Sequence, residues 1–192
     1  MPIPRPLANL GSSLDDVLFN FVVNLLPDDV ISNSFIRPRL ARWLGLRCGE
    51  GTQIRNGIFY EDHRRLIVGS NVLLNRKAHL DAGGGIRIGH NVRFGPQVMM
   101  VTGSHEVGSP GMRTGPLVYK PIAIGDGCWM GAHVFVGPGV TIGAGCIVSA
   151  GSVVLRSMPA HYLIAGNPAR PVSPLSGADR EAGGTPAALP SE

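Results

Sequence analysis

Large apolar residues recur at every sixth position along much of this chain, separated by small and polar residues. From Val68 the sequence reads VGSNVL and LNRKAH, it resumes at Ile88 as IGHNVR and FGPQVM, and from Ile124 it runs IGDGCW, MGAHVF, VGPGVT, IGAGCI and VSAGSV. A period of six fits neither the 3.6-residue repeat of a helix nor the two-residue alternation of a half-buried strand. Each hexad is therefore expected to form one short strand and a turn.

Three hexads, about 18 residues, are expected to complete one coil of a triangular parallel β-helix, for which hexapeptide repeats are a known signature. The second hexad position is usually glycine, which is expected to allow the sharp corner between strands. The first position should stack inside the prism, and its residues are Val68, Leu74, Leu80, Ile88, Phe94, Met100, Ile124, Met130, Val136, Ile142, Val148 and Val154. The fifth position is small or β-branched, with Val72, Ala78, Val92, Val98, Cys128, Val134, Val140, Cys146 and Ser152.

Two interruptions break this repeat. The step from Leu80 to Ile88 is eight residues, which predicts a two-residue bulge within AGGGIR at 82–87. The step from Met100 to Ile124 is 24 residues, a multiple of six, so a loop over residues 101–123 can be extruded while the coil keeps its phase. His105 lies in this loop and is the best catalytic candidate in the chain.

Residues 1–47 are expected to form a short helical segment after an irregular lead-in over residues 1–12. A first helix is predicted from Ser13, which can cap it, with Asp15 and Asp16 in the first turn, to Pro27. Its helically spaced apolar residues are Leu14, Val17, Leu18, Phe21, Val22, Leu25 and Leu26. Such a helix can lie on a membrane surface. Packing on the neighbouring domain is favoured instead, because the helix carries acidic residues rather than a basic face.

A second helix is predicted over residues 35–44, followed by Gly45 just past its end. Its arginines, Arg37, Arg39 and Arg42, are expected to be exposed. Leu40, Trp43 and Leu44 are expected to point inward. The β-helix is predicted over residues 48–157, a short cap over its last coil at 158–173, and a disordered, Gly-, Ala- and Pro-rich tail at 174–192.

Composition and charge narrow the possible partners. The formal net charge is +4 and the pI is about 9.3, without runs of Lys and Arg interleaved with aromatic residues. This favours an anionic small molecule over nucleic acid. No apolar run is long enough for a membrane span, and no signal peptide is expected. The three cysteines lack CxxC spacing, which indicates a reducing, cytoplasmic location; Cys128 and Cys146 are expected to stack as buried thiols in neighbouring coils.

Three blocks resemble a known family: VTGSHEVG at 101–108, the hexads from PIAIGDGCW to AGSVV at 121–154, and AGNPARPV at 165–172. Over roughly residues 48–172 the chain resembles the hexapeptide-repeat acyltransferases, and most of all the sugar and polysaccharide O-acetyltransferases, including the galactoside, maltose and colanic-acid enzymes. The resemblance implies an all-β, left-handed parallel β-helix. It also implies a homotrimer with active sites between subunits, and acetyl-CoA as the donor.

The resemblance also assigns roles to individual residues. It implies that His105 is the catalytic histidine and that Asn75 helps to bind the acceptor. The implied coenzyme A contacts are Trp129 and Ala132 along the acyl-pantetheine groove, Ala150 and Gly151 where the coil backbone passes close to the cofactor, and Arg156 and Arg170 near its phosphates and adenine. Asp81 is expected either to touch the acceptor or the His105 ring, or to cap the turn that follows it.

Acyl transfer from a thioester to a hydroxyl group needs a base, donors for the oxyanion and alignment of both substrates. Imidazole titrates near neutral pH, so His105 suits the role of base, and the Ala132 N–H is the candidate oxyanion donor by resemblance. The other histidines are scattered without the spacing of a metal site, so no metal is expected. The N-terminal segment of the galactoside and maltose enzymes is not recognisable here, which argues against a simple disaccharide acceptor.

The sequence thus predicts an acetyl-CoA-dependent O-acetyltransferase acting on a hydroxyl group of a sugar, glycan or glycosylated metabolite. N-acetylation of an amino sugar and transfer of a longer acyl chain remain open alternatives. So does a catalytically silent β-helix scaffold, although a scaffold has no need of an insertion that carries a histidine.

Overall fold

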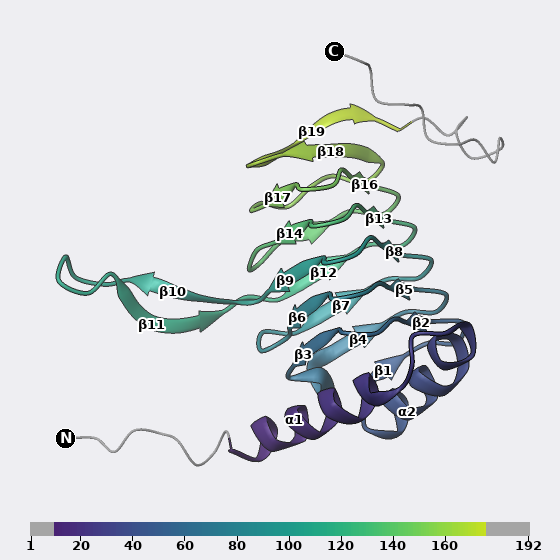
Figure 1. Ribbon diagram of the computed structural model, residues 1–192. Coiled ribbons are helices and arrows are strands. Elements are labelled where there is room, and N and C mark those ends of the chain that lie inside the picture. Colours follow the sequence, from purple (N-terminus) through teal and green to yellow (C-terminus); the bar gives the residue numbers. More distant parts are fainter. Residues whose placement is uncertain (1–9, 176–192) are drawn as a thin grey trace, which may run out of the picture.

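The computed structural model describes residues 10–175. Most of the predicted lead-in (residues 1–12) and nearly all of the predicted tail (residues 174–192) lie outside the described residues. The described chain is a stack of parallel coils standing on two N-terminal helices (Figure 1). The predicted all-β, parallel β-helix built from hexapeptide repeats is confirmed.

Three sheets form the walls of the solenoid. The first contains β1 (Arg47–Cys48), β4 (Leu66–Val68), β7 (Ile86–Ile88), β12 (Ile122–Ile124) and β15 (Thr141–Ile142). The second contains β2 (Gln53–Ile54), β5 (Leu73–Leu74), β8 (Arg93–Phe94), β13 (Trp129–Met130), β16 (Ile147–Val148), β18 (Tyr162–Gly166) and β19 (Ala169–Pro174). The third contains β3 (Phe59–Glu61), β6 (His79–Asp81), β9 (Met99–Val101), β14 (Phe135–Val136) and β17 (Val153–Val154). Within these sheets only β18 and β19 pair antiparallel.

The core is built from two hexad positions, the first, which was expected to point inward, and the fifth. All the predicted first-position residues and all the predicted fifth-position residues are buried. Cys128 and Cys146 are among them, and they precede strands that pair with each other, Trp129 opposite Ile147. The predicted stacking of two buried thiols in neighbouring coils is therefore observed.

The second-position glycines are required by close contact between coils rather than by the turn. A methyl group on Gly95 would lie 2.4 Å from the backbone nitrogen of Ala132, and one on Gly125 would lie 2.5 Å from that of Ala144. The left-handed backbone of each turn falls instead at the fourth position. Asn91 has φ 58° and Gly127 has φ 69° there. Glycine is needed where a side chain would collide with the next coil.

The long insertion leaves the phase of the solenoid intact. Met100 of β9 pairs with Leu80 in the coil before it and with Val136 in the coil after it. Between these coils the chain leaves the wall as an antiparallel hairpin of β10 (Gly103–Val107) and β11 (Thr114–Tyr119), which projects sideways (Figure 1). The predicted bulge lies between β6 and β7. A second eight-residue step, from Tyr60 to Val68, contains a 3-10 turn at His63–Arg65 that the sequence did not reveal.

Helix α1 (Leu10–Leu25) begins before Ser13, so the predicted cap at Ser13 is wrong. The Asp16 carboxylate does not lie in the first turn of α1, where it was expected. It accepts hydrogen bonds from the backbone N–H groups of Asp62 (2.7 Å) and His63 (3.2 Å). Among the described residues, no helix is long and apolar enough to cross a membrane.

A ladder of polar side chains on α1 closes the open edge of β3. The Asn20 side-chain amide donates to the carbonyl oxygen of Tyr60 (2.7 Å) and accepts from the Tyr60 N–H (2.8 Å). Asn24 does the same one turn later, donating to the carbonyl of Ile58 (2.8 Å) and accepting from the N–H of Gly57 (2.9 Å). These amides take the place of a preceding strand and satisfy backbone groups that would otherwise lack partners.

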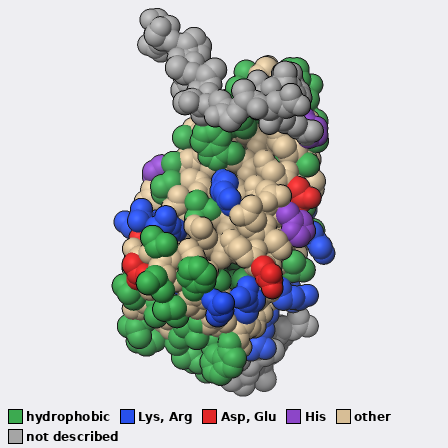
Figure 2. All heavy atoms as spheres, turned by 90° about the vertical axis from the view of Figure 1, so that its right-hand side faces the viewer, with side chains coloured by type: hydrophobic (Ala, Val, Ile, Leu, Met, Phe, Trp, Pro, Cys, Tyr) green, Lys and Arg blue, Asp and Glu red, His purple; other side chains and the backbone are tan. Residues whose placement is uncertain are grey.

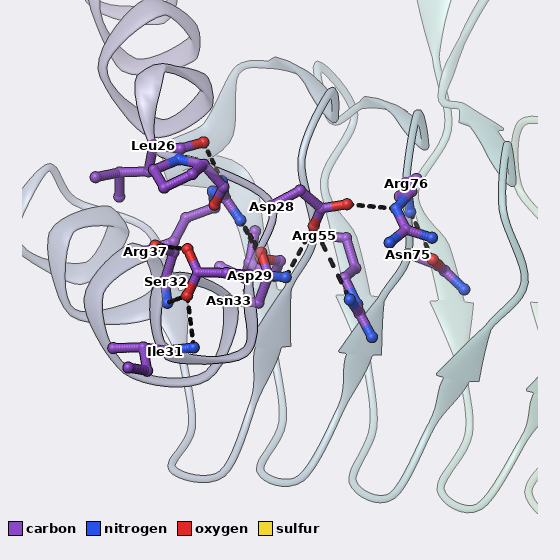
Figure 3. A network of polar contacts seen from close by, with 12 residues as sticks. Leu26, Asp28, Asp29, Ile31, Ser32, Asn33, Arg37, Arg55, Asn75 and Arg76 are labelled. Carbon is purple, nitrogen blue, oxygen red and sulfur yellow. Dashed lines mark hydrogen bonds and ion pairs between the residues drawn. The ribbon is translucent and has the colours of Figure 1, made fainter.

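The second helical region is a π-helical turn at Ser32–Ile36 followed by α2 (Arg37–Trp43). Two orientations predicted for it are wrong: Arg37 is fully buried, whereas Trp43 is 81% exposed. The Arg37 guanidinium donates to backbone carbonyls, including those of Val23 (2.8 Å) and Ile54 (2.9 Å). It also donates to the carbonyl of Leu26 (2.7 Å; Figure 3). It joins the helices to the first coil because it supplies donors to carbonyls that helix ends and turns leave open.

The last coil is covered by the segment that follows it. Met158 forms a bridge with Ile142 of β15, and β18 adds to β16 in parallel. The chain then reverses into β19, which pairs antiparallel with β18 and forms the outer edge of the second sheet.

Candidate active site

His105 lies on β10, in the hairpin that projects from the solenoid, opposite Leu117 of β11. The side chain is exposed, and its Nδ1 atom lies 2.9 Å from the carbonyl oxygen of Gly115. A carbonyl oxygen only accepts, so Nδ1 carries the proton of this hydrogen bond. Nε2 is then left with a free lone pair in the neutral imidazole, which is the arrangement that a general base requires.

The root of the hairpin is organised by Asp81, at the end of β6. Its carboxylate accepts from the backbone N–H of Gly83 (3.0 Å) and from that of Gly103 (3.3 Å), and Thr102 Oγ1 lies 3.3 Å from it. The turn-capping role considered for Asp81 is therefore present. The same contacts connect the bulge after β6 to the first residue of the hairpin, so Asp81 fixes where β10 leaves the coil.

Tyr119, at the end of β11, is part of this root and was not singled out by the sequence. A methyl group on Gly83 would lie 2.5 Å from its ring, so the glycines of the bulge make room for the tyrosine. Burial and then the negative charge of Asp81 raise the pKa of Tyr119. The run of three glycines after Ala82 was a usable signal, because such a run indicates close approach of another group as well as a turn.

Four other predicted residues lie at a different edge of the prism. We call the connections from the second to the third sheet (residues 55–58, 75–78, 95–98, 131–134 and 149–152) the groove corner, and those from the third sheet onward (62–65, 82–85, 102–121, 137–140 and 155–157) the hairpin corner. Asn75, Ala132, Ala150 and Gly151 all lie at the groove corner.

At the groove corner, the predicted donor-site residues stack in consecutive coils. The N–H of Gly151 donates to the carbonyl of Ala132 (2.8 Å). A methyl group on Gly131 would lie 2.5 Å from the nitrogen of Ala150, so these coils are in tight contact. A methyl group on Gly151, by contrast, would meet nothing within 4 Å. Around Ala132, Ala150 and Gly151 the corner therefore consists of small residues in tight contact, with open space beside Gly151.

Asn75 is half-buried at the same corner and accepts a hydrogen bond from the N–H of Arg76 (2.8 Å). Arg76 in turn contacts Asp28, from the turn after α1, through its Nε atom (Figure 3). The hydrogen bond from Arg76 lowers the pKa of the Asp28 carboxyl group. The N-terminal segment therefore reaches the groove corner beside Asn75, a contact between distant segments that the sequence pattern did not indicate.

The remaining predicted residues are exposed on the second sheet or beyond it. Trp129 points outward from β13 and is 43% exposed. Arg170 lies on β19 and donates to the carbonyl of Ala169 (2.8 Å). Arg156 is exposed at the hairpin corner, just after β17.

The structure therefore brings the predicted residues into two groups rather than one. His105 and Arg156 lie at the hairpin corner, with Asp81 next to it at the end of β6, whereas Asn75, Ala132, Ala150 and Gly151 lie at the groove corner. The third sheet separates the two corners within one chain. Across residues 10–175, no three histidine, cysteine or acidic side chains come together as a metal site would require.

Comparison with known proteins agrees with this architecture. Residues 121–156 match the family described as bacterial transferase hexapeptide (six repeats). The putative colanic acid biosynthesis acetyltransferase WcaF of Escherichia coli (strain K12) is 35% identical over 133 residues, which cover 69% of this chain and 71% of that protein. The galactoside O-acetyltransferase of the same organism is 28% identical over 144 residues, covering 75% of this chain and 71% of that protein.

Among solved structures, a galactoside acetyltransferase in complex with coenzyme A superimposes with a TM-score of 0.83, covering 98% of this chain and 94% of that one at 24% identity. At that level of sequence identity the superposition supports the fold assignment alone. The family match and the colanic-acid relative extend the assignment from the fold to the family, because the alignment with that relative covers most of both proteins. With repeats, hairpin and relatives in agreement, this chain belongs to the hexapeptide-repeat acetyltransferases.

Proposed function

We propose that the protein transfers an acetyl group from acetyl-CoA to a hydroxyl group of a sugar or glycan, with His105 as the general base. The observation that carries the proposal is the hydrogen bond from His105 Nδ1 to the carbonyl of Gly115. It holds the exposed imidazole in one tautomer and leaves Nε2 as the acceptor. A backbone partner of this kind orients a histidine without adding a charge.

The proposed reaction is a direct transfer within a ternary complex. Nε2 of His105 removes the proton from the acceptor hydroxyl group as its oxygen attacks the thioester carbonyl carbon. The carbon–sulfur bond then breaks, the acetyl group remains on the acceptor oxygen, and the imidazolium returns its proton to the thiolate of coenzyme A. General base catalysis of this kind typically contributes about 10²–10⁴-fold to the rate.

The donor is proposed to lie along the groove corner. Its small residues let an extended chain approach the backbone closely, and the open space beside Gly151 accommodates it. We keep the N–H of Ala132 as the oxyanion donor and Trp129 as the outer wall of the groove. Arg156 and Arg170 are exposed and permanently charged, and they are proposed to contact the phosphates of coenzyme A. In the solved galactoside acetyltransferase of the same fold, coenzyme A is the bound molecule.

Because one chain holds the base and the donor groove at different corners, the proposed site is completed by a neighbouring copy in a homotrimer. The exposed surfaces next to the hairpin corner fit such a contact. Phe59 and Met99, on the outer face of the third sheet, are 49% and 41% exposed, and the Phe59 ring stacks on His79 with centroids 4.9 Å apart. On the hairpin, Val107 and Met112 are 86% and 69% exposed.

The acceptor is proposed to lie between Asn75 and the hairpin root at Asp81. O-transfer is favoured over N-transfer because the galactoside relative is named as an O-acetyltransferase. The Asp81 carboxylate is already engaged by backbone N–H groups, so it is proposed to shape this pocket rather than to take part in proton transfer.

The first test is calorimetric titration of acetyl-CoA into the wild type and into the double variant Arg156→Ala/Arg170→Ala. We expect saturable binding at one site per chain in the wild type and weaker binding in the variant. No heat of binding to a folded wild-type protein would contradict the donor assignment. Equal affinity for acetyl-CoA in the two proteins would show that the two arginines do not contribute to donor binding.

The second test measures release of free coenzyme A thiol with methyl galactoside, methyl glucoside and glucosamine as acceptor probes. We expect His105→Ala to lower kcat by about 10²–10⁴-fold with little change in affinity for acetyl-CoA. Glu106→Gln, an exposed neighbour on the same strand, is the matched control and should keep its activity. A His105→Ala protein as active as the control would refute the proposed base. Activity confined to glucosamine would favour the N-transfer alternative.

A further inference from the structure

The outer face of α1 is apolar and uncovered. Its exposed residues lie at helical spacing along one stripe, with Leu14, Val17, Leu18, Phe21 and Leu25 exposed by 54–71%. The sequence pattern had favoured burial of these residues against the neighbouring domain. The helix does pack on the solenoid, but with its opposite face, where Asp16, Asn20 and Asn24 bind the backbone of the first coil. On that side of the helix Phe19 and Val23 are buried in the core. The apolar stripe is therefore not used to hold the helix in place.

The same end of the molecule carries further exposed apolar side chains. They are Val30, Ile31, Phe35 and Ile36 around the π-helical turn, exposed by 45–73%, and Trp43 at the end of α2, exposed by 81%. Figure 2 shows hydrophobic side chains gathered at the lower end of the molecule, over the N-terminal helices. We call these five residues, together with the five of α1, the basal patch. Patches of this kind usually mark an interaction site.

Arginines border the basal patch. Figure 2 shows Lys and Arg side chains in a band beside the hydrophobic ones. Arg39 and Arg42 of α2 are exposed, and the Arg39 guanidinium lies 5.8 Å from the centre of the Phe35 ring. Trp43 lies next to Arg42 in sequence, so the patch combines an exposed aromatic ring with cationic groups. That combination is typical of protein surfaces that meet a membrane interface.

The acidic groups near the patch are already engaged. Asp15 pairs with Arg64 at 2.9 Å. The Asp29 carboxylate accepts from the Ser32 hydroxyl group (2.6 Å) and from the backbone N–H groups of Ser32 (2.9 Å) and Ile31 (2.8 Å). Arg39 and Arg42 contact backbone carbonyls rather than carboxylates. Asp29 keeps its negative charge in these bonds, but Arg39 and Arg42 have no carboxylate partner among the described residues, so their charges are available to an anionic partner.

We propose that the basal patch docks the protein on an anionic lipid bilayer, with α1 lying in the plane of the interface. Apolar side chains would enter the acyl boundary while the arginines meet lipid phosphates. A second copy of this chain fits less well, because a two-fold contact would bring the arginines of both copies against each other. Neither helix spans a bilayer, so the contact would be peripheral.

The test is flotation with vesicles of phosphatidylcholine alone and of phosphatidylcholine with 30% phosphatidylglycerol. The wild type should float with the anionic vesicles and much less with the neutral ones. Leu18→Ser/Phe21→Ser should lower the partition coefficient at least tenfold, and Arg39→Gln/Arg42→Gln should lower it on anionic vesicles by about fivefold for each arginine. Leu155→Ser/Val172→Ser is the matched control, because these two apolar residues are 56% and 60% exposed far from the patch.

Trp43 gives an independent readout, since Trp129 is the only other tryptophan. In a Trp129→Phe protein, anionic vesicles should shift the Trp43 emission to the blue, and brominated lipids should quench it. The proposal is overturned if the wild type stays unbound on all vesicles, or if the basal and control variants float equally. It is also overturned if the basal substitutions leave flotation unchanged but lower the mass measured by sedimentation, because the patch would then join copies of the chain.

Discussion

Two glycines in one hexad, Gly125 and Gly127, should respond very differently to alanine. A methyl group on Gly125 would lie 2.5 Å from the nitrogen and 2.7 Å from the Cα of Ala144. Ordinary contacts begin at about 3.4 Å, so the new carbon would overlap the backbone of the next coil by almost 1 Å. At Gly127 the nearest atom, the Cα of Gly145, is 4.0 Å away, but φ is 69°.

The two costs can be worked out separately. Alanine at Gly127 adopts a left-handed conformation, which costs about 1–2 kcal/mol. The reduced freedom of the unfolded chain offsets about 0.4–1 kcal/mol of this, so the net loss should be about 1 kcal/mol. At Gly125 the colliding atoms are backbone, and the N–H of Gly125 is itself bonded to the carbonyl of Ile142 at 2.8 Å. Overpacking typically costs about 1–3 kcal/mol, and this site should lie at or above the upper limit because no side chain can move aside.

Thermal unfolding of the wild type and both variants, at one protein concentration, measures the difference between these two costs. For a chain of this size each kcal/mol lowers Tm by about 2–4 °C. Gly127→Ala should therefore melt about 2–4 °C below the wild type, and Gly125→Ala at least about 6–12 °C below it. If Gly125→Ala melts at or above Gly127→Ala, then contact between coils does not explain the second-position glycines.

Three further predictions concern stability. Asn20→Ala should lower the free energy of unfolding by about 2–3 kcal/mol, because it leaves an N–H and a carbonyl of β3 without partners; an unchanged urea midpoint would contradict this. Arg37→Met should cost about 3 kcal/mol or more by the same measurement, since several buried carbonyls lose their donor, whereas the exposed Arg39→Met should stay within about 0.5 kcal/mol. Burial, and then Asp81, raises the pKa of Glu61 above its ordinary 4.5. Its contribution to stability is therefore present below about pH 4.5 and lost as pH rises through the raised value, so Glu61→Gln should gain stability relative to the wild type between pH 4 and pH 7; parallel Tm curves over that range would contradict the assignment.

The solenoid could be predicted from the sequence because a six-residue period is a strong local signal. The phase held across the insertion, and an extruded loop followed from a step divisible by six, although its hairpin structure did not. The N-terminal helices were harder, because amphipathic spacing was interpreted as pointing inward. At the open end of a β-helix the surface to be covered is a row of backbone N–H and C=O groups. Asn20 and Asn24 satisfy these groups, and Phe19 and Val23 are buried on the same helix, so the face of α1 that packs combines polar and apolar residues.

The candidate site also contains residues that the sequence could indicate and contacts that it could not. His105 could be singled out because it lies in the one long break in the repeat. Its partner, the carbonyl of Gly115, is set by the register of the hairpin and carries no side-chain signal. Tyr119 and Asp28 reach the site from distant segments, and only the folded chain brings them beside Asp81 and Arg76. Periodicity predicts which residues line a wall but not which distant side chains meet there.

The closed ends of the solenoid have a consequence for how the protein behaves at high concentration. A stack of nearly equivalent coils can in principle be extended by further chains, because each exposed strand edge can pair with a strand of another molecule. Here the first edge of the third sheet is occupied by the amides of α1. The last edge of the second sheet, β19, runs antiparallel and contains Pro171 and Pro174, which have no N–H to offer. Two of the strand edges at which another chain could add are thus occupied or lack donors, which disfavours growth of the β-helix into polymers.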